Sequence, residues 1–402
     1  MSETLLQFKK ELETELENIL SYWINHDVDD VYGGFIGKID QFNNADKHAD
    51  KGSVLNSRIL WSFSAAYNLT KKPVYLEYAH KAYDYFIDHF IDKTYAGVYW
   101  SVNYKGEPAD RKKQVYAISF AIYALSEFYR ATALDNAKKY AIDLFTVIEQ
   151  YSYDPVKAGY IDAFKENWAP MQDIRLSAKD ANEKKTMNTH LHILEAYTNL
   201  YRIWASENLK GKIKNLLQNF IDYIVDDKTG HLFLFFDEDW NRKSTIISYG
   251  HDIEASWLLQ EAAEAINDKE LMVFTKGLSV KMAAAAKEGV DTDGGLWYEY
   301  EPAENHLIKE KHWWPQAEAM VGFFNAWQVS NMDENLELSF SNWDFTKKHI
   351  VDHQLGEWVW GVNADYSIME GQDKVGIWKC PYHNSRACIE IIKRIQTISL
   401  TA

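Results

Sequence analysis

Two ionisable residues stand at the start of an apolar, helix-forming stretch near the middle of the chain. His251 and Glu254 lie three positions apart within residues 248–259, and Trp257 and Leu258 continue the stretch. Positions i and i+3 share one face of a helix, so the pair could be a general base with an orienting carboxylate. A satisfied buried histidine with a capping carboxylate is the structural alternative. The choice depends on whether other parts of the chain bring similar groups to the same place.

Charge and composition exclude several classes of protein. The 402 residues include 43 Lys and Arg against 59 Asp and Glu, a formal net charge of −16, so nucleic acids and anionic membranes are poor partners. Cys380 and Cys388 form no disulfide framework and no CxxC motif, which favours a reducing compartment. The N-terminus lacks the apolar core of a signal peptide, and no apolar run reaches the length of a membrane span. We therefore expect a cytoplasmic protein without nucleic-acid or membrane partners.

A glycine-aromatic signature recurs along the chain at a nearly constant interval. Its glycines are Gly34, Gly97, Gly159, Gly230, Gly295 and Gly356, separated by 63, 62, 71, 65 and 61 residues. A period of this kind indicates a repeat architecture. The first and last copies keep the signature, which favours a closed ring over an open solenoid with polar end repeats.

Each copy contains one helix-period segment before the signature and one after it. The first segments span residues 5–23, 74–91, 134–151, 209–225, 270–286 and 336–351. The second segments span residues 54–67, 114–129, 188–204, 252–266, 316–327 and 384–395. The second set is more apolar, so we expect it to form an inner ring. The prediction is a single domain over residues 1–402, an all-α (α/α)6 barrel of six helical hairpins with short β-hairpin-like loops at the catalytic mouth.

Polar and aromatic residues stand at the starts of all six inner segments. If the hairpins run up and down, these starts lie at one mouth of the barrel and the side chains converge. The candidates are Arg58, Tyr116, Asn188, His192, His251, Glu254, Trp313, Trp314, Glu318, His383 and Arg386. Because every copy contributes at least one, a single site is a better explanation than six unrelated buried polar residues.

Several histidines without an evident nucleophile indicate proton abstraction next to a carbonyl. Helix N-termini depress the pKa of a histidine, and a histidine that is neutral near pH 7 can accept a proton. Arg58 and Arg386 would then hold oxygens of the substrate or of an anionic intermediate.

Other chemistries match the residues less well. His190 and His192 are two positions apart on a helix and point to different faces, so we expect no metal site at this pair. The chain has neither a Gly-rich phosphate loop nor a nucleophile elbow. A glycoside hydrolase stays open, because Asp180, Glu254 and Glu318 could flank a glycosidic bond as acid and base.

These residues resemble the N-acylglucosamine 2-epimerase superfamily, and within it the cellobiose 2-epimerases and their mannobiose-acting relatives. The matching stretches are residues 51–58, 185–192, 250–257, 313–318 and 378–384. The resemblance implies the same barrel and a reversible C2 epimerisation of the reducing-end sugar of β-1,4-linked disaccharides. It also implies that no external cofactor takes part. We expect no metal site, and the sequence does not give the oligomeric state, although members of the family are often monomers.

The resemblance further implies roles for individual residues. His383 would open the sugar ring and remove the C2 proton, and His251, held by Glu254, would return a proton to the other face of a cis-enediolate. The binders of the C1 and C2 oxygens would be Arg58, Asn188 and His192. The residues around the sugar would be Tyr116, Trp314 and Trp378, with Asp180 reaching the distal sugar.

The same superfamily offers alternatives. A monosaccharide epimerase or isomerase, of the N-acylglucosamine 2-epimerase or mannose isomerase type, is the first of them, and an (α/α)6 glycoside hydrolase is the second. The sequence does not select cellobiose, mannobiose or lactose, because loops around the distal sugar decide that choice. Residues 367–372 match no pattern of the family.

Overall fold

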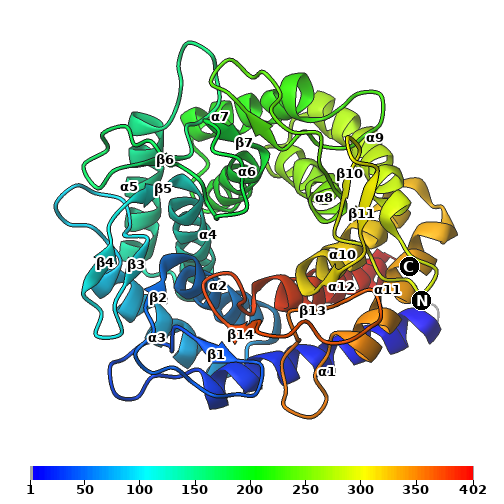
Figure 1. The fold of residues 1–402 in the computed structure, drawn as a ribbon, viewed down its shortest axis with the longest axis horizontal. Helices are drawn as coiled ribbons and strands as arrows, with labels where there is room; N and C mark the ends of the chain where they lie inside the picture. Colours follow the sequence, from blue (N-terminus) through cyan, green and yellow to red (C-terminus); the bar gives the residue numbers. More distant parts are fainter. Residues whose placement is uncertain (1–2, 402) are drawn as a thin grey trace.

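A computed structural model describes residues 3–401 as two concentric rings of helices (Figure 1). The outer helices are α1 (Glu3–His26), α3 (Pro73–His89), α5 (Asp135–Tyr151), α7 (Glu207–Asn219), α9 (Lys269–Ala286) and α11 (Asp333–His349). The inner helices are α2 (Ser53–Thr70), α4 (Val115–Thr132), α6 (Met187–Tyr201), α8 (Tyr249–Ala265), α10 (Trp313–Ser330) and α12 (Tyr382–Thr401). A π-helical turn (Phe220–Ile224) follows α7, and a 3-10 turn (Lys287–Gly289) follows α9. The predicted (α/α)6 barrel and its inner ring are confirmed.

The ring closes through the two ends of the chain. The inner helices contact one another in order, and α12 contacts α2 to complete the circle. Helix α1 packs against α12, whereas each other outer helix packs against the inner helix before it in the chain. Two indole N–H groups strengthen this closure: Trp23 donates to Glu357 and Trp358 donates to Glu15, both at 2.7 Å. Within residues 3–401, none of the helices combines the length and apolarity that crossing a membrane demands.

Short antiparallel strands join neighbouring repeats over one mouth of the barrel. The pairs are β2 (Lys51–Gly52) with β3 (Ser101–Val102), β5 (Lys113–Gln114) with β6 (Ala163–Phe164), β7 (Lys185–Thr186) with β8 (Phe235–Phe236), β9 (Ile247–Ser248) with β10 (Glu299–Glu301), β12 (Lys311–His312) with β13 (Gly361–Val362), and β1 (Ile39–Asp40) with β14 (Asp373–Val375). Two further strands make hairpins, β4 (Pro108–Asp110) with β3 and β11 (His306–Ile308) with β10. Most of the expected hairpin-like loops therefore pair across repeats, which holds the inner-helix starts at one level.

Buried lysines fix the turns that precede these strands. Lys51 Nζ lies 2.7 Å from Asp29 Oδ2 and also donates to the carbonyl of Gly33. The equivalent pairs are Lys113–Asp92, Lys185–Asp154, Lys311–Asp291 and Lys374–Asp352. In the fourth repeat Ile247 takes the position of the lysine. Because each lysine is buried beside a buried or half-buried carboxylate, loss of that carboxylate would leave a buried charge without a partner, so the pairs specify the turn geometry.

A second polar position on the inner helices points outward rather than toward the axis. His190 Nε2 accepts the backbone N–H of Tyr160 at 3.0 Å, and Asp252 Oδ1 accepts that of Leu232 at 2.8 Å. Both bonds hold a glycine-aromatic segment against the start of an inner helix. His190 is thus a structural residue, and it lies on a different face of α6 from His192.

Asp27 makes the stability of the barrel depend on pH. Its carboxyl is buried, and neither oxygen has a hydrogen-bond partner among the described residues. Burial raises the pKa of Asp27 well above its usual value, although Lys51 acts in the opposite direction. A raised folded-state pKa adds stability below the unfolded-state pKa of about 4, and this stability is lost as pH rises.

We therefore expect Asp27→Asn to stabilise the barrel increasingly with pH. The gain over the wild type should be about 1–3 kcal/mol larger at pH 8 than at pH 4, because the buried charge is removed. Chemical denaturation of both proteins at the two pH values measures this difference. A gain that does not change with pH would contradict the account.

Candidate active site

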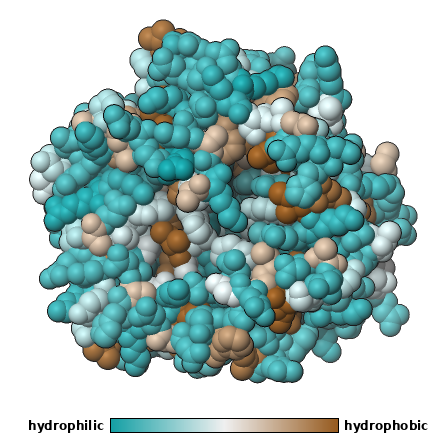
Figure 2. Space-filling model, viewed as in Figure 1, coloured by the Kyte–Doolittle hydropathy of each residue, from teal (hydrophilic) through white to brown (hydrophobic). Residues whose placement is uncertain are grey.

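The inner helices bring most of the predicted residues to the barrel axis. Arg58 lies on α2, Tyr116 on α4, Asn188 and His192 on α6, His251 and Glu254 on α8, Trp314 and Glu318 on α10, and His383 and Arg386 on α12. The face that carries the strands is hollowed at its centre, between hydrophilic loops (Figure 2). The site therefore lies at the bottom of this depression.

His383 is held as a proton acceptor. Its Nδ1 lies 2.7 Å from Glu318 Oε1, and the same oxygen accepts a hydrogen bond from Arg386 at 2.6 Å. An ionised carboxylate has no proton to give, so Nδ1 carries the proton and Nε2 keeps a free lone pair. Burial, with Arg58 and Arg386 nearby, holds the pKa of His383 well below its usual value. Glu318, expected as a substrate ligand, orients this imidazole instead.

His251 has a different partner from the predicted one. Its Nδ1 lies 2.8 Å from the hydroxyl of Ser248, while Glu254 accepts a hydrogen bond from Arg386 at 2.6 Å. The prediction that Glu254 holds His251 is wrong, because Glu254 bonds the buried guanidinium of Arg386 and Ser248 bonds His251 instead. Burial, helped by His192, lowers the pKa of His251 to about 3. A hydroxyl can donate or accept, so Ser248 supports His251 in either protonation state.

Ser248→Ala tests this contact. We expect the mutant to turn over about 3- to 10-fold more slowly with little change in KM, since a neutral hydrogen bond contributes about 1 kcal/mol. Ser256→Ala is the matched control, because its buried hydroxyl bonds only the backbone of Ile253 on the same helix. Equal kcat values for the two mutants would show that Ser248 does not position His251.

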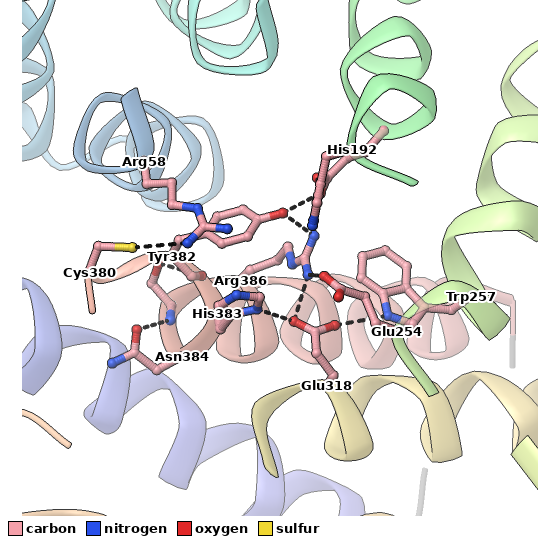
Figure 3. A network of polar contacts seen from close by, with 12 residues as sticks. Arg58, His192, Glu254, Trp257, Glu318, Cys380, Tyr382, His383, Asn384 and Arg386 are labelled. Atoms are coloured by element: carbon pink, nitrogen blue, oxygen red, sulfur yellow. Dashed lines mark hydrogen bonds and ion pairs between the residues drawn. The ribbon is translucent and has the colours of Figure 1, made fainter. Parts of the chain in front are cut away.

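Arg386 is the centre of a buried charge network (Figure 3). Its Nη2 bonds Glu254 and Glu318, and its Nη1 bonds Glu195 and the hydroxyl of Tyr382. The side chain is 1% exposed. Both terminal nitrogens are therefore occupied by the protein, and Arg386 positions carboxylates rather than meeting the substrate as expected.

The network leaves one carboxyl to be protonated. Burial and the nearby Glu318 raise the pKa of Glu254 to about 8. Burial also raises the pKa of Glu318, but that carboxylate accepts hydrogen bonds from Arg386, His383 and the indole of Trp257. The better-solvated group keeps the charge when two acids compete, so Glu254 carries the proton at neutral pH.

A metal ion would find its position already filled. Ligand atoms of Glu254, Glu318 and His383 lie within 4.8 Å of one another, a spacing that could suit a cation. Nη2 of Arg386 bonds both carboxylates at 2.6 Å. The guanidinium thus supplies the positive charge between them.

Arg58 is a buried cation without a carboxylate partner among the described residues. Its Nη2 donates to the hydroxyl of Tyr116 at 2.7 Å, and its Nη1 contacts Cys380 Sγ at 3.7 Å. The guanidinium stacks over Phe120 at 4.1 Å and over Tyr382 at 4.7 Å, and its Nε has no partner. A buried charge that meets only neutral groups is suited to an anion that forms during a reaction.

Helix α6 carries two hydrogen-bond acceptors, of which His192 packs against the same rings, Tyr116 and Phe120, as Arg58. His192 Nδ1 is 2.9 Å from Glu195 Oε2, which leaves Nε2 as the free nitrogen. The side-chain oxygen of Asn188 is buried, and no described residue bonds it. Asn188 and His192 are one helical turn apart, so the two acceptors share a face.

Two of the predicted tryptophans lie at the site, and the third packs in the wall behind it. The ring of Trp314 lies 4.7 Å from that of His251 and 5.8 Å from that of His383. Trp378 lies 6.1 Å from the ring of Tyr116. Trp313 is buried against Trp360 at 4.5 Å, so it supports the wall instead of lining the depression.

Asp180 lies apart from the histidines, on the loop between β6 and β7. Its Oδ2 accepts the backbone N–H of Ser177 at 2.8 Å. Burial raises the pKa of Tyr298, and the charges of Glu299 and Asp180 add to the shift, so these groups are neighbours. The ring of Tyr298 lies 6.4 Å from that of Trp314. Asp180 is therefore a neighbour of Tyr298, whose ring in turn lies near Trp314.

The sequence interpretation missed three residues that position the site: Ser248, Glu195 and Tyr382. Glu195 follows His192 by three positions, the same spacing that drew attention to His251 and Glu254, so a signal for it was present. Ser248 and Tyr382 carry no pattern that sets them apart from ordinary cap and core residues.

The fold and the site define an (α/α)6-barrel enzyme with buried histidines and a buried arginine that has no carboxylate partner among the described residues. The sequence matches the N-acylglucosamine 2-epimerase (GlcNAc 2-epimerase) family over residues 34–387, and the chain belongs to this family.

Similar proteins extend this assignment. The chain is 50% identical over 385 residues to a cellobiose 2-epimerase from Bacteroides fragilis, covering 96% of the chain and 98% of that protein. A cellobiose 2-epimerase from Dictyoglomus turgidum is 40% identical, with the same coverage. The structure of a cellobiose 2-epimerase from Bacillus thermoamylovorans superposes with a TM-score of 0.91 at 40% identity, over 96% of this chain and 99% of that one.

Proposed function

We propose that the protein epimerises C2 of the reducing-end sugar of β-1,4-linked disaccharides, converting the glucose to the mannose configuration and back. The protein is a carbohydrate epimerase, an isomerase, and its relatives named cellobiose 2-epimerases support a disaccharide substrate. Cellobiose, mannobiose and lactose are the candidate substrates.

The observation that carries the proposal is the placement of His251 and His383 about Trp314. Helix α10 lies between α8 and α12 in the inner ring, and the Trp314 ring on α10 is near both His251 on α8, at 4.7 Å, and His383 on α12, at 5.8 Å. Inversion at a carbon needs a proton removed from one face and returned to the other. Two histidines that flank one aromatic platform meet this requirement.

The chemistry follows from the protonation states. Nε2 of His383 removes the C2 proton of the open-chain aldose, and the electrons of the C–H bond move toward C1 to give a cis-enediolate. Arg58 stabilises the charge on the enediolate oxygens. Rotation about the C2–C3 bond turns the other face toward His251, whose protonation the new negative charge favours. His251, once protonated from solvent, gives this proton to C2 and the C1=O1 double bond re-forms, while His383 releases the proton it took from C2 to solvent. The reverse reaction exchanges the two roles.

Tyr298 and Asp180 are the residues that would bind the distal sugar. Tyr298 lies 6.4 Å from Trp314 and has Asp180 as a neighbour, so these two residues are placed to meet the second sugar of a disaccharide bound at Trp314. An aromatic ring and a carboxylate are groups that bind a sugar face and its hydroxyls. We infer that this part of the rim, with Trp378 on the opposite side, sets the preference for disaccharides.

Product analysis tests the proposal. Incubation with cellobiose or mannobiose should yield the C2 epimer, separable by chromatography, without monosaccharides. Free glucose would instead indicate a glycoside hydrolase. Conversion of free mannose to a ketose, with neither disaccharide consumed, would indicate a monosaccharide isomerase.

A further inference from the structure

We propose that His192 opens and recloses the sugar ring by carrying a proton between O1 and O5, and that His383 and His251 act at C2 alone. The inference rests on the proposed function, because a ring hemiacetal must open before the C2 proton becomes acidic. It differs from the role that the sequence resemblance implies, in which His383 performs both steps.

The first support is the fixed polarity of the His192 ring. Arg386 and Tyr382 both bond Glu195, and burial opposes its ionisation, but Arg386 and His192 keep the pKa of Glu195 at about 2. Glu195 is therefore a carboxylate, so Nδ1 of His192 carries the proton that bonds it. Nε2 presents a lone pair, which can accept the proton of a hydroxyl but cannot donate to a carbonyl oxygen.

The second support is the position of His192 beside Arg58. The ring of Tyr116 lies 4.9 Å from that of His192, and its hydroxyl accepts the hydrogen bond from Arg58. The ring of Phe120 lies 4.7 Å from His192 and 4.1 Å below the Arg58 guanidinium. His192 and Arg58 therefore pack against the same two aromatic rings. A hydroxyl that loses its proton to His192 would have Arg58 beside the resulting oxygen.

The third support is the unpartnered oxygen of Asn188. It lies one helical turn before the His192 acceptor and is buried without a bond from any described residue. A buried acceptor without a donor is costly, so a donor from the substrate is expected there. Two acceptors on one face of α6 fit adjacent O–H groups of a neutral sugar.

These contacts divide the inner ring into two halves. Arg58, Tyr116 and His192 come from α2, α4 and α6, whereas His251, Trp314 and His383 come from α8, α10 and α12. The second half supplies the two bases that inversion at C2 needs. The first half supplies a base, a cation and acceptors, which are the groups that a reaction at C1 needs.

The step balances with His192 alone. Nε2 takes the proton of the O1 hydroxyl, the O1 lone pair forms the C1=O1 double bond, and the C1–O5 bond breaks. The imidazolium then gives that proton to O5, which becomes the O5 hydroxyl, and His192 is neutral again. O1 and O5 are both bonded to C1, so one nitrogen can reach the two oxygens in turn.

Anomer interconversion isolates this step, because it requires ring opening but no chemistry at C2. A single anomer of cellobiose is dissolved with enzyme in D₂O, and proton NMR follows both the anomeric signals and loss of the C2 proton.

We expect wild-type enzyme to accelerate both processes. His383→Gln should lose C2 exchange and keep the acceleration of anomer interconversion. His192→Ala should lose about 10²-fold or more of that acceleration, and added imidazole should restore part of it.

Controls separate the inference from folding and from the proposed function. His306→Gln removes an exposed histidine of β11 and should match the wild type in both rates. Thermal unfolding of His192→Ala shows whether the barrel is intact, and imidazole rescue requires that it is. Anomer interconversion at the wild-type rate in His192→Ala, at the buffer rate in His383→Gln, or at the buffer rate in the wild type would each overturn the inference. A wild type that forms no epimer would instead contradict the proposed function.

Discussion

Replacement of His383 by glutamine is expected to slow epimerisation by about 10²- to 10⁴-fold, the usual contribution of a general base. Glutamine can donate to Glu318 as the imidazole does, so the carboxylate keeps a partner and the barrel should unfold at the wild-type temperature. Initial rates of epimer formation from cellobiose, together with a melting curve, measure both outcomes. A folded mutant with wild-type activity would remove His383 from the reaction.

Replacement of Arg386 by methionine should have the largest effect on stability. Glu195, Glu254 and Glu318 would remain buried without their cation, and breaking such a network costs about 3–5 kcal/mol. The loss should grow with pH, because without Arg386 the carboxyl groups have raised folded-state pKa values, and the stability they add at low pH disappears as they ionise. Urea unfolding at pH 5 and pH 8 measures the effect.

Two further variants define the cause of this loss. Arg386→Lys keeps the charge but not the fork that bonds both Glu254 and Glu318, so its stability should lie between those of the wild type and Arg386→Met. Arg202→Met breaks the more exposed pair with Glu261 and should cost less than about 1 kcal/mol. If Arg386→Met were no less stable than Arg202→Met, the buried network would not hold the inner ring together.

The architecture was largely predictable because it is repeated. Six copies of the glycine-aromatic signature located the helices, and the more apolar set proved to be the inner ring. The lysine pairs were missed, although Lys51 and Lys113 stand at the same distance before their inner helices. A buried lysine is unusual, and only the carboxylate beneath each turn explains it.

The site was predictable as a set of residues but not as a set of contacts. Spacing on a helix shows which side chains share a face. It does not show which partner a carboxyl group will bond when several donors lie nearby. Glu254 lies three positions from His251, but its carboxyl group accepts a hydrogen bond from Arg386, which is far away in sequence. Ser248 and Glu318 then hold the two histidines, and only the closed ring brings Glu318 to His383.

Solvent deuterium at C2 in the His251→Gln mutant tests the two-histidine account most directly. With cellobiose in D₂O, His383 can still remove the C2 proton and return a deuteron to the same face. The account predicts recovered cellobiose that carries deuterium at C2, with formation of the epimer reduced by about 10²-fold or more. Formation of the C2-deuterated epimer at the wild-type rate would show that His251 does not deliver the proton and would contradict the account.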